Sequence, residues 1–195
     1  MLSRTRDLFR AYLRHVIDGH VISAGHLNDP RRELAVEISE RLEQLVFIVD
    51  RVRALEGQLA AVSHEPQAGT AYYESASERA ARLEMHVLTE SFYYCASRVR
   101  SIARNERYPL PGLGSFECRA VRDIRNQLLE HPEGAASRIL MSSFGRGGAG
   151  GPVIKPLRPV GRESVFPDAG LFANSEDFAN ALSNLIQEAL TRVGA

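Results

Sequence analysis

The chain has 195 residues, which is enough for one domain with a substantial apolar core. Its 24 basic and 24 acidic residues balance, so no strong net charge draws the whole protein to nucleic acid or to a membrane surface. No apolar run reaches the roughly 18 residues of a membrane span, and charged residues interrupt the N-terminal segment, which excludes a signal-peptide core.

The use of arginine and cysteine indicates where the protein works. All basic residues except Lys155 are arginine, which is typical of a high-GC bacterial coding sequence. Cys95 and Cys118 both fall in helical patterns and do not form a disulfide framework. We therefore expect reduced thiols and a cytoplasmic location.

The first half of the chain predicts two helices. Leu8, Tyr12 and Val16 indicate a short helix within residues 2–20. Asp29 can cap the next helix, with Pro30 at its first position. That helix continues for about 30 residues. Its apolar stripe consists of Leu34, Ile38, Leu42, Leu45, Val49, Val52, Leu59 and Val62.

The second half predicts three more helices, over residues 75–104, over 116–130 after a Ser115 cap, and from Asn174 onward. The apolar positions expected in the core are Leu83, Val87, Cys95, Val99 and Ile102, then Phe116, Ala120, Ile124 and Leu128, and finally Phe178, Leu182, Leu185, Ile186, Leu190 and Val193. The prediction is a single all-α domain over residues 1–195, built as a bundle of four or five helices.

Residues 141–173 interrupt the helical pattern. They hold 7 of the 15 glycines and 4 of the 9 prolines. Connections of this length within a compact domain are usually functional or irregular. We predict an irregular arm or a small hairpin insertion, with Val153-Ile154 and Val160 as strands on either side of Lys155-Pro156.

The main functional motif is Arg125-Asn126 followed by His131 and Pro132. Histidine transfers protons near neutral pH, and arginine grips a phosphate with two hydrogen bonds, so the motif suggests phosphodiester chemistry without a metal. The spacing alone is uninformative, because four of the six histidines follow an arginine in this way. The neighbouring amide and the helix-ending proline distinguish this pair from the others.

Geometry limits how the two side chains can cooperate. On an ideal helix Arg125 and His131 point about 120° apart, so a shared site needs an unwound last turn or a second subunit. The alternative is structural: Arg125 pairs with Asp123 or Glu130, and His131 caps the helix end, where the dipole favours a positive charge.

The motif, placed on the fourth helix of a bundle, resembles the signature of the HEPN superfamily (higher eukaryotes and prokaryotes nucleotide-binding) over about residues 30–140. The resemblance implies an α-helical homodimer that cleaves RNA without a metal, at a cleft between subunits. It implies that Arg125 binds the scissile phosphate, that His131 is the general base or acid, and that Asn126 orients one of them. Glu84 or Glu90 is a possible supporting acid.

The leading hypothesis is therefore an endoribonuclease, or a toxin-like component of a defence or toxin–antitoxin pair whose partner is an antitoxin or another protein. The alternatives are a non-catalytic nucleic-acid or nucleotide-binding module and a protein-interaction bundle. Arginines in residues 91–125, the basic residues of 145–162, and Tyr93, Tyr94 and Tyr108 could contact RNA, although solvated faces and core packing explain them equally well. No cofactor or metal is predicted, since the glycine-rich segment lacks a phosphate-loop Lys-Ser/Thr and the cysteines and histidines lack zinc spacing.

Overall fold

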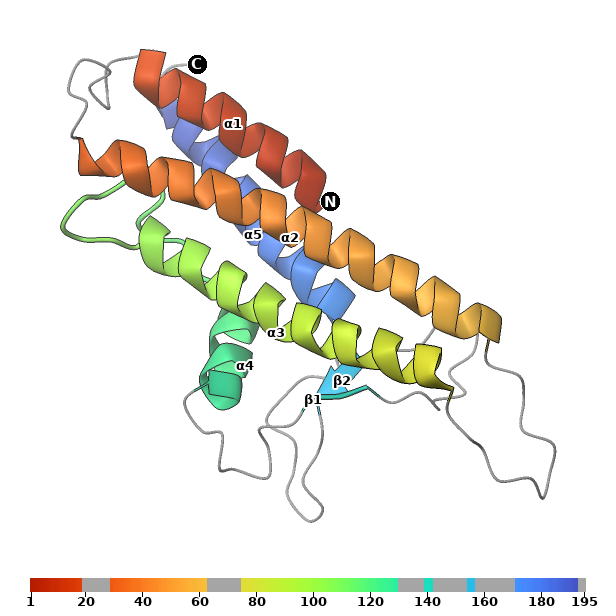
Figure 1. Cartoon of the computed structure of the whole chain (residues 1–195). Coiled ribbons are helices and arrows are strands. Elements are labelled where there is room, and N and C mark those ends of the chain that lie inside the picture. Colours follow the sequence, from red (N-terminus) through yellow and green to blue (C-terminus); the bar gives the residue numbers. More distant parts are fainter. Residues whose placement is uncertain (19–28, 63–74, 130–138, 142–153, 157–170, 193–195) are drawn as a thin grey trace.

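A computed structural model describes residues 1–18, 29–62, 75–129, 139–141, 154–156 and 171–192 of the chain (Figure 1). In this part, the helices are α1 (Leu2–Asp18), α2 (Pro30–Val62), α3 (Ala76–Ala103), α4 (Arg119–Leu129) and α5 (Leu171–Arg192). The short strands are β1 (Ile139–Met141) and β2 (Ile154–Pro156). The predicted all-α fold of four or five helices is confirmed. None of the described helices is long and apolar enough to cross a membrane.

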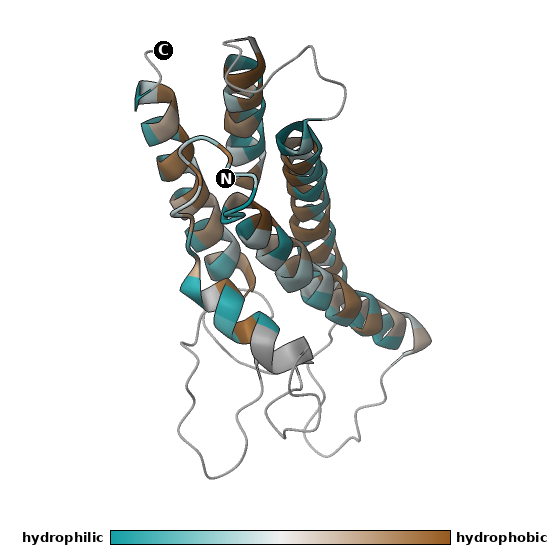
Figure 2. Ribbon diagram, turned by 90° about the vertical axis from the view of Figure 1, so that its left-hand side faces the viewer, coloured by the Kyte–Doolittle hydropathy of each residue, from teal (hydrophilic) through white to brown (hydrophobic). Residues whose placement is uncertain are grey.

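The four longer helices lie side by side, and α2 runs opposite to α1, α3 and α5 (Figure 1). The pairs α1–α2, α2–α3 and α1–α5 pack on each other, while the short α4 packs on α3. Teal and brown alternate along the helices in Figure 2, as expected of helices with one polar and one apolar side. The largest fully buried side chains include Tyr12, Phe9, Phe92, Phe116 and Phe178.

Local capping chemistry sets the starts of α2 and α3. The Asp29 carboxylate accepts a hydrogen bond from the Arg31 backbone N–H at 2.9 Å, which confirms the predicted cap. Ser75 and Glu78 form a reciprocal capping box, with bonds of 3.2 Å and 2.8 Å. The bounds of α3 therefore agree with the prediction.

The predicted apolar stripe of α3 is only partly correct. Leu83 and Val87 are each 60 % exposed, so their assignment to the core is wrong. Met85, Phe92 and the other buried residues of α3 lie on a stripe that passes through Thr89. The Thr89 hydroxyl donates to the Met85 carbonyl at 2.8 Å, which satisfies this polar group in the core and disguises the stripe in the sequence.

The fourth helix begins later than predicted, at Arg119, so Ser115 is not its cap. The preceding segment forms a turn in which the Leu113 N–H donates to the Leu110 carbonyl at 3.1 Å and Gly112 has a φ of +76°. Proline and then glycine at its centre suit a type II turn. Phe116 follows this turn outside the helix, yet it is buried with its ring edge-to-face on Phe178.

The last helix begins earlier than predicted, at Leu171, so Asn174 and Ser175 lie inside it. Both are buried. The Asn174 amide Nδ2 donates to the Tyr93 hydroxyl at 2.7 Å, and the Ser175 hydroxyl donates to the Phe172 carbonyl at 2.7 Å. These partners explain why two typical capping residues can occupy the helix interior.

The predicted hairpin has the wrong register. Strands β1 and β2 pair antiparallel, with Leu140 opposite Lys155 and Ile139 opposite Pro156. Lys155 and Pro156 therefore lie in a strand and not at its turn. The apolar run 139–141, which precedes the predicted arm, supplies the partner strand. Val160 and most of the arm lie outside the described residues.

Candidate functional site

An open, polar groove of about 440 Å³ lies between α3 and α4. One wall consists of α3 residues spaced three or four apart, which therefore share one face of the helix. The other wall consists of two α4 residues spaced three apart. Among the described residues that line the groove, four of seven are arginines and none is acidic. The lining residues are Tyr94, Ser97, Arg98, Arg100, Ser101, Arg122 and Arg125.

Glu117, just before α4, holds two guanidinium groups beside this groove. Arg100 donates two parallel hydrogen bonds to its carboxylate, each 2.7 Å long, and Arg104 donates a third of the same length. The hydrogen bond from Arg100 lowers the pKa of Glu117, so this carboxylate stays ionised at neutral pH. The bidentate geometry holds the Arg100 side chain in a defined orientation.

Two further carboxylates are shared in the same way. Glu37 of α2 accepts two hydrogen bonds from Arg98, at 2.7 Å and 3.0 Å, and lies 3.7 Å from Arg41. Arg98 lowers the pKa of Glu37 through its hydrogen bonds. Asp123 of α4 contacts two arginines of the same helix, Arg122 at 2.9 Å and Arg119 at 3.4 Å.

The ion pairs offset part of the positive charge of the groove. Three of its arginines are each paired with a carboxylate: Arg98 with Glu37, Arg100 with Glu117 and Arg122 with Asp123. None of these three carboxylates lines the groove. An anion that enters the groove therefore meets guanidinium and hydroxyl donors, an arrangement that suits a phosphate.

The structure places one residue of the predicted catalytic motif in this groove. Arg125 lines it and is half-buried. Asn126 is the next residue of α4, and its side chain is outside the described part of the structure, as is the whole of His131. The structure thus brings Arg125 together with Arg98 and Arg122, and the pairing of Arg125 with His131 stays a prediction.

The two suggested supporting acids lie elsewhere. Glu84 accepts two hydrogen bonds from Arg51 of α2, at 2.6 Å and 2.9 Å, and these bonds lower its pKa. Glu90 lies 3.2 Å from the His86 ring nitrogen, one turn earlier on α3. Neither carboxylate lines the arginine groove.

The three tyrosines near the basic stretch have different surroundings. Tyr93 is buried, and burial raises the pKa of its hydroxyl to about 12, so it is a core residue bonded to Asn174. Tyr108 has the Arg107 guanidinium 5.2 Å from its ring centre. Tyr94 is 51 % exposed and lines the groove, so its ring is the one available for stacking there.

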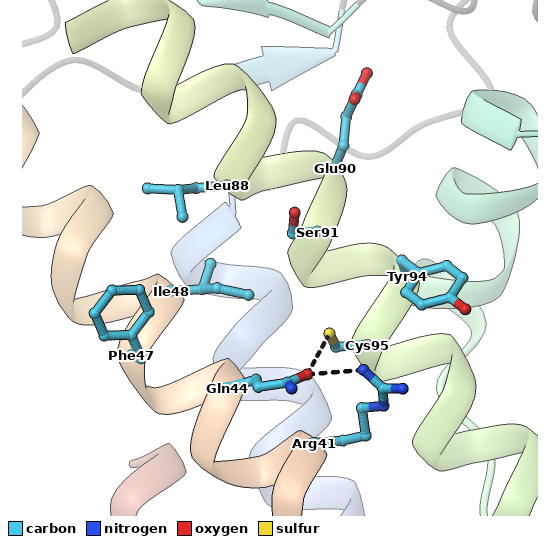
Figure 3. Close-up of a pocket in the computed structure, with 9 residues that line it drawn as sticks. All are labelled: Arg41, Gln44, Phe47, Ile48, Leu88, Glu90, Ser91, Tyr94 and Cys95. Atoms are coloured by element: carbon cyan, nitrogen blue, oxygen red, sulfur yellow. Dashed lines mark hydrogen bonds between the residues drawn. The ribbon is translucent and has the colours of Figure 1, made fainter.

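A second, more apolar pocket of about 500 Å³ adjoins the groove on the α2 side (Figure 3). Its lining residues are Arg41, Gln44, Phe47, Ile48, Leu88, Glu90, Ser91, Tyr94 and Cys95. The Gln44 carbonyl oxygen accepts hydrogen bonds from Arg41 at 2.9 Å and from the Cys95 thiol at 3.3 Å. Burial raises the pKa of Cys95, which keeps it a protonated donor.

Within the described ranges, no three histidine, cysteine or acidic side chains come together as metal ligands. Comparison of the chain with protein-family models, with curated proteins and with solved structures finds no match. The functional argument therefore starts from the arginine groove.

Proposed function

We propose that the arginine groove binds the phosphates of single-stranded RNA, and that the protein is a HEPN-like endoribonuclease. The observation that carries this proposal is the convergence of four arginines on a groove whose described lining residues include no acid. Net charge is zero over the whole chain, so RNA binding depends on the guanidinium groups that line this groove. The exposed ring of Tyr94 favours a single strand, whose bases are free to stack.

The proposed cleavage uses the RNA's own 2′-hydroxyl as nucleophile. His131 accepts the 2′-hydroxyl proton, or donates the proton that the leaving 5′-oxygen takes up. As the new P–O2′ bond forms, the P–O5′ bond breaks, which yields a 2′,3′-cyclic phosphate and a 5′-hydroxyl. Arg125 stabilises the charge that develops on the phosphate oxygens, and Asn126 orients one of the reacting groups.

The proposal includes a homodimer. Leu83 and Val87 are each 60 % exposed on the outer side of α3, where a solvated helix would carry polar side chains. Contact between these residues and a second copy would bury them. Sedimentation of the wild type and of Val87→Asp tests this contact, and a wild-type monomer at micromolar concentration would refute it.

Binding is tested with a fluorescently labelled 12-nucleotide 2′-fluoro RNA, which lacks the attacking hydroxyl, and cleavage is tested with the unmodified RNA in EDTA. We expect Arg125→Ala to weaken binding about tenfold, because a charged bidentate contact is lost. The matched control is Arg119→Ala on the same helix, whose side chain is 84 % exposed outside the groove. Its affinity should stay within about twofold of the wild type.

For cleavage, we expect the wild type to produce a 2′,3′-cyclic phosphate, and His131→Ala to bind RNA normally without cutting it. RNA binding without cleavage by the wild type would leave a non-catalytic binding module. Absence of binding even at low salt would refute the proposal and leave a protein-interaction bundle.

A further inference from the structure

We propose that the α2–α3 pocket is a base subsite, which holds one unpaired base of the strand bound in the arginine groove. This inference rests on the proposed function and adds to it a class of preferred base. Its starting point is continuity, since Tyr94 lines both the arginine groove and the α2–α3 pocket. A nucleotide joins a charged phosphate to a flat, largely apolar base. The arginine groove suits the phosphate, and the adjoining, more apolar α2–α3 pocket suits the base.

The walls of the pocket suit a flat ring. Phe47 is 65 % exposed and Tyr94 51 % exposed, although aromatic side chains of this size are usually buried in a helical bundle. Ile48 and Leu88 form the apolar surface between them, as Figure 3 shows. A base that stacks on these side chains would cover apolar surface that the described part of the chain leaves exposed.

The polar end of the pocket holds donors from Gln44 and Arg41, and the carboxylate of Glu90, which also lines the pocket, points away from both in Figure 3. The carbonyl oxygen of Gln44 already accepts from Arg41 and Cys95, so its amide nitrogen is the group left to donate (Figure 3). The guanidinium of Arg41, whose side chain is partly exposed and lines the pocket, is the second donor group. Two donor groups select a base edge with a carbonyl oxygen. Uracil, cytosine and guanine have this oxygen, and adenine lacks it.

The Arg41 side chain also connects the two cavities. Its guanidinium carbon lies 5.9 Å from the centre of the Tyr94 ring. Its Nη2 lies 3.7 Å from the carboxylate of Glu37, which also binds Arg98 of the groove. The same chain of contacts thus orients the stacking ring, the donor group and a phosphate-binding arginine. A single nucleotide likewise carries its base ring, the polar edge of that base and its phosphate in one connected unit.

The test compares two 2′-fluoro strands of equal length, which lack the attacking hydroxyl: an oligouridylate and an abasic strand. We expect Phe47→Ala to weaken oligouridylate binding about tenfold and to leave abasic binding unchanged. Gln44→Leu should remove the preference for oligouridylate over oligoadenylate. The control is Val36→Ala, an exposed apolar residue of α2 outside the pocket. Circular dichroism confirms the folding of each variant.

The outcomes separate this inference from the proposed function. If both strands bind equally and Phe47→Ala changes neither affinity, the base subsite is refuted while the phosphate groove stands. If neither strand binds the wild type, both proposals fail. If Phe47→Ala converts a dimer to a monomer and leaves RNA affinity unchanged, a second copy of the chain covers this face, and the base subsite is again refuted.

Discussion

The turn before α4 predicts that Gly112→Ala strongly destabilises the protein. Gly112 has a φ of +76°, which costs an L-residue with a side chain about 1 kcal/mol. A Cβ atom at this position would also lie 2.5 Å from the Cβ of Ala189 in α5. This contact is too short to persist, and the turn would have to move away from the helix.

Movement of the turn would affect the packing of α1 as well. The Tyr12 hydroxyl donates to the Pro111 carbonyl at 2.8 Å, and the loss of such a bond costs about 1 kcal/mol. Together with the backbone strain and the lost packing of the turn, we expect Gly112→Ala to reduce the free energy of unfolding by about 3 kcal/mol. That is a large part of the roughly 5–15 kcal/mol typical of a domain.

Urea unfolding, followed by circular dichroism at 222 nm, measures this change. The matched control is Gly114→Ala, two residues later, where an added Cβ meets nothing within 4 Å. We expect that control to change stability by less than about 0.5 kcal/mol. Ala189→Gly should lower the free energy of unfolding less in the Gly112→Ala background than in the wild type, because it removes the steric conflict. Equal stability of the two glycine variants, or strictly additive effects, would refute the reasoning.

Three further changes test the packing. Gly57→Ala should stabilise α2 by about 1 kcal/mol in urea unfolding, since an added Cβ meets nothing within 4 Å. Burial raises the pKa of Glu56 from 4.5 to about 7. Between these two pH values the folded state holds the Glu56 proton more tightly than the unfolded state does, so the free energy of unfolding falls as the pH rises. Glu56→Gln should remove that fall, about 1–2 kcal/mol given its partial exposure, when unfolding is compared at pH 5 and pH 8. Asn174→Ala should cost about 1–3 kcal/mol, and a smaller loss in a Tyr93→Phe background would confirm their hydrogen bond.

Helix starts with local chemical signals could be predicted from the sequence. Asp29 with Pro30, and Ser75 with Glu78, satisfy the first backbone N–H groups of α2 and α3 through residues at most three positions away. The start of α5 could not be predicted in this way. Asn174 is a typical cap residue, but its amide donates to the hydroxyl of Tyr93, 81 residues earlier, and this long-range bond lets it be buried inside a helix.

The sequence predicted one residue of the candidate site, Arg125, but not the other residues that line the groove. The motif directed attention to Arg125, but the groove depends on how α4 packs on α3, which no local pattern specifies. The pairing of the arginines in residues 91–125 could not be predicted either, because the carboxylate that accepts from Arg98 is Glu37 on α2. The predicted apolar stripe through Leu83 was wrong because the true stripe includes Thr89, a polar residue whose hydroxyl bonds to the backbone of its own helix.

The most direct test of the central claim is the salt dependence of RNA affinity, measured for the wild type and for Arg125→Ala and Arg119→Ala. Each phosphate contact on a single strand adds about −0.7 to the slope of log affinity against log salt concentration. The account predicts that Arg125→Ala makes this slope shallower by about 0.7, while Arg119→Ala leaves it unchanged. A slope that Arg125→Ala does not alter, or that the two variants alter equally, would contradict a phosphate-binding groove between α3 and α4.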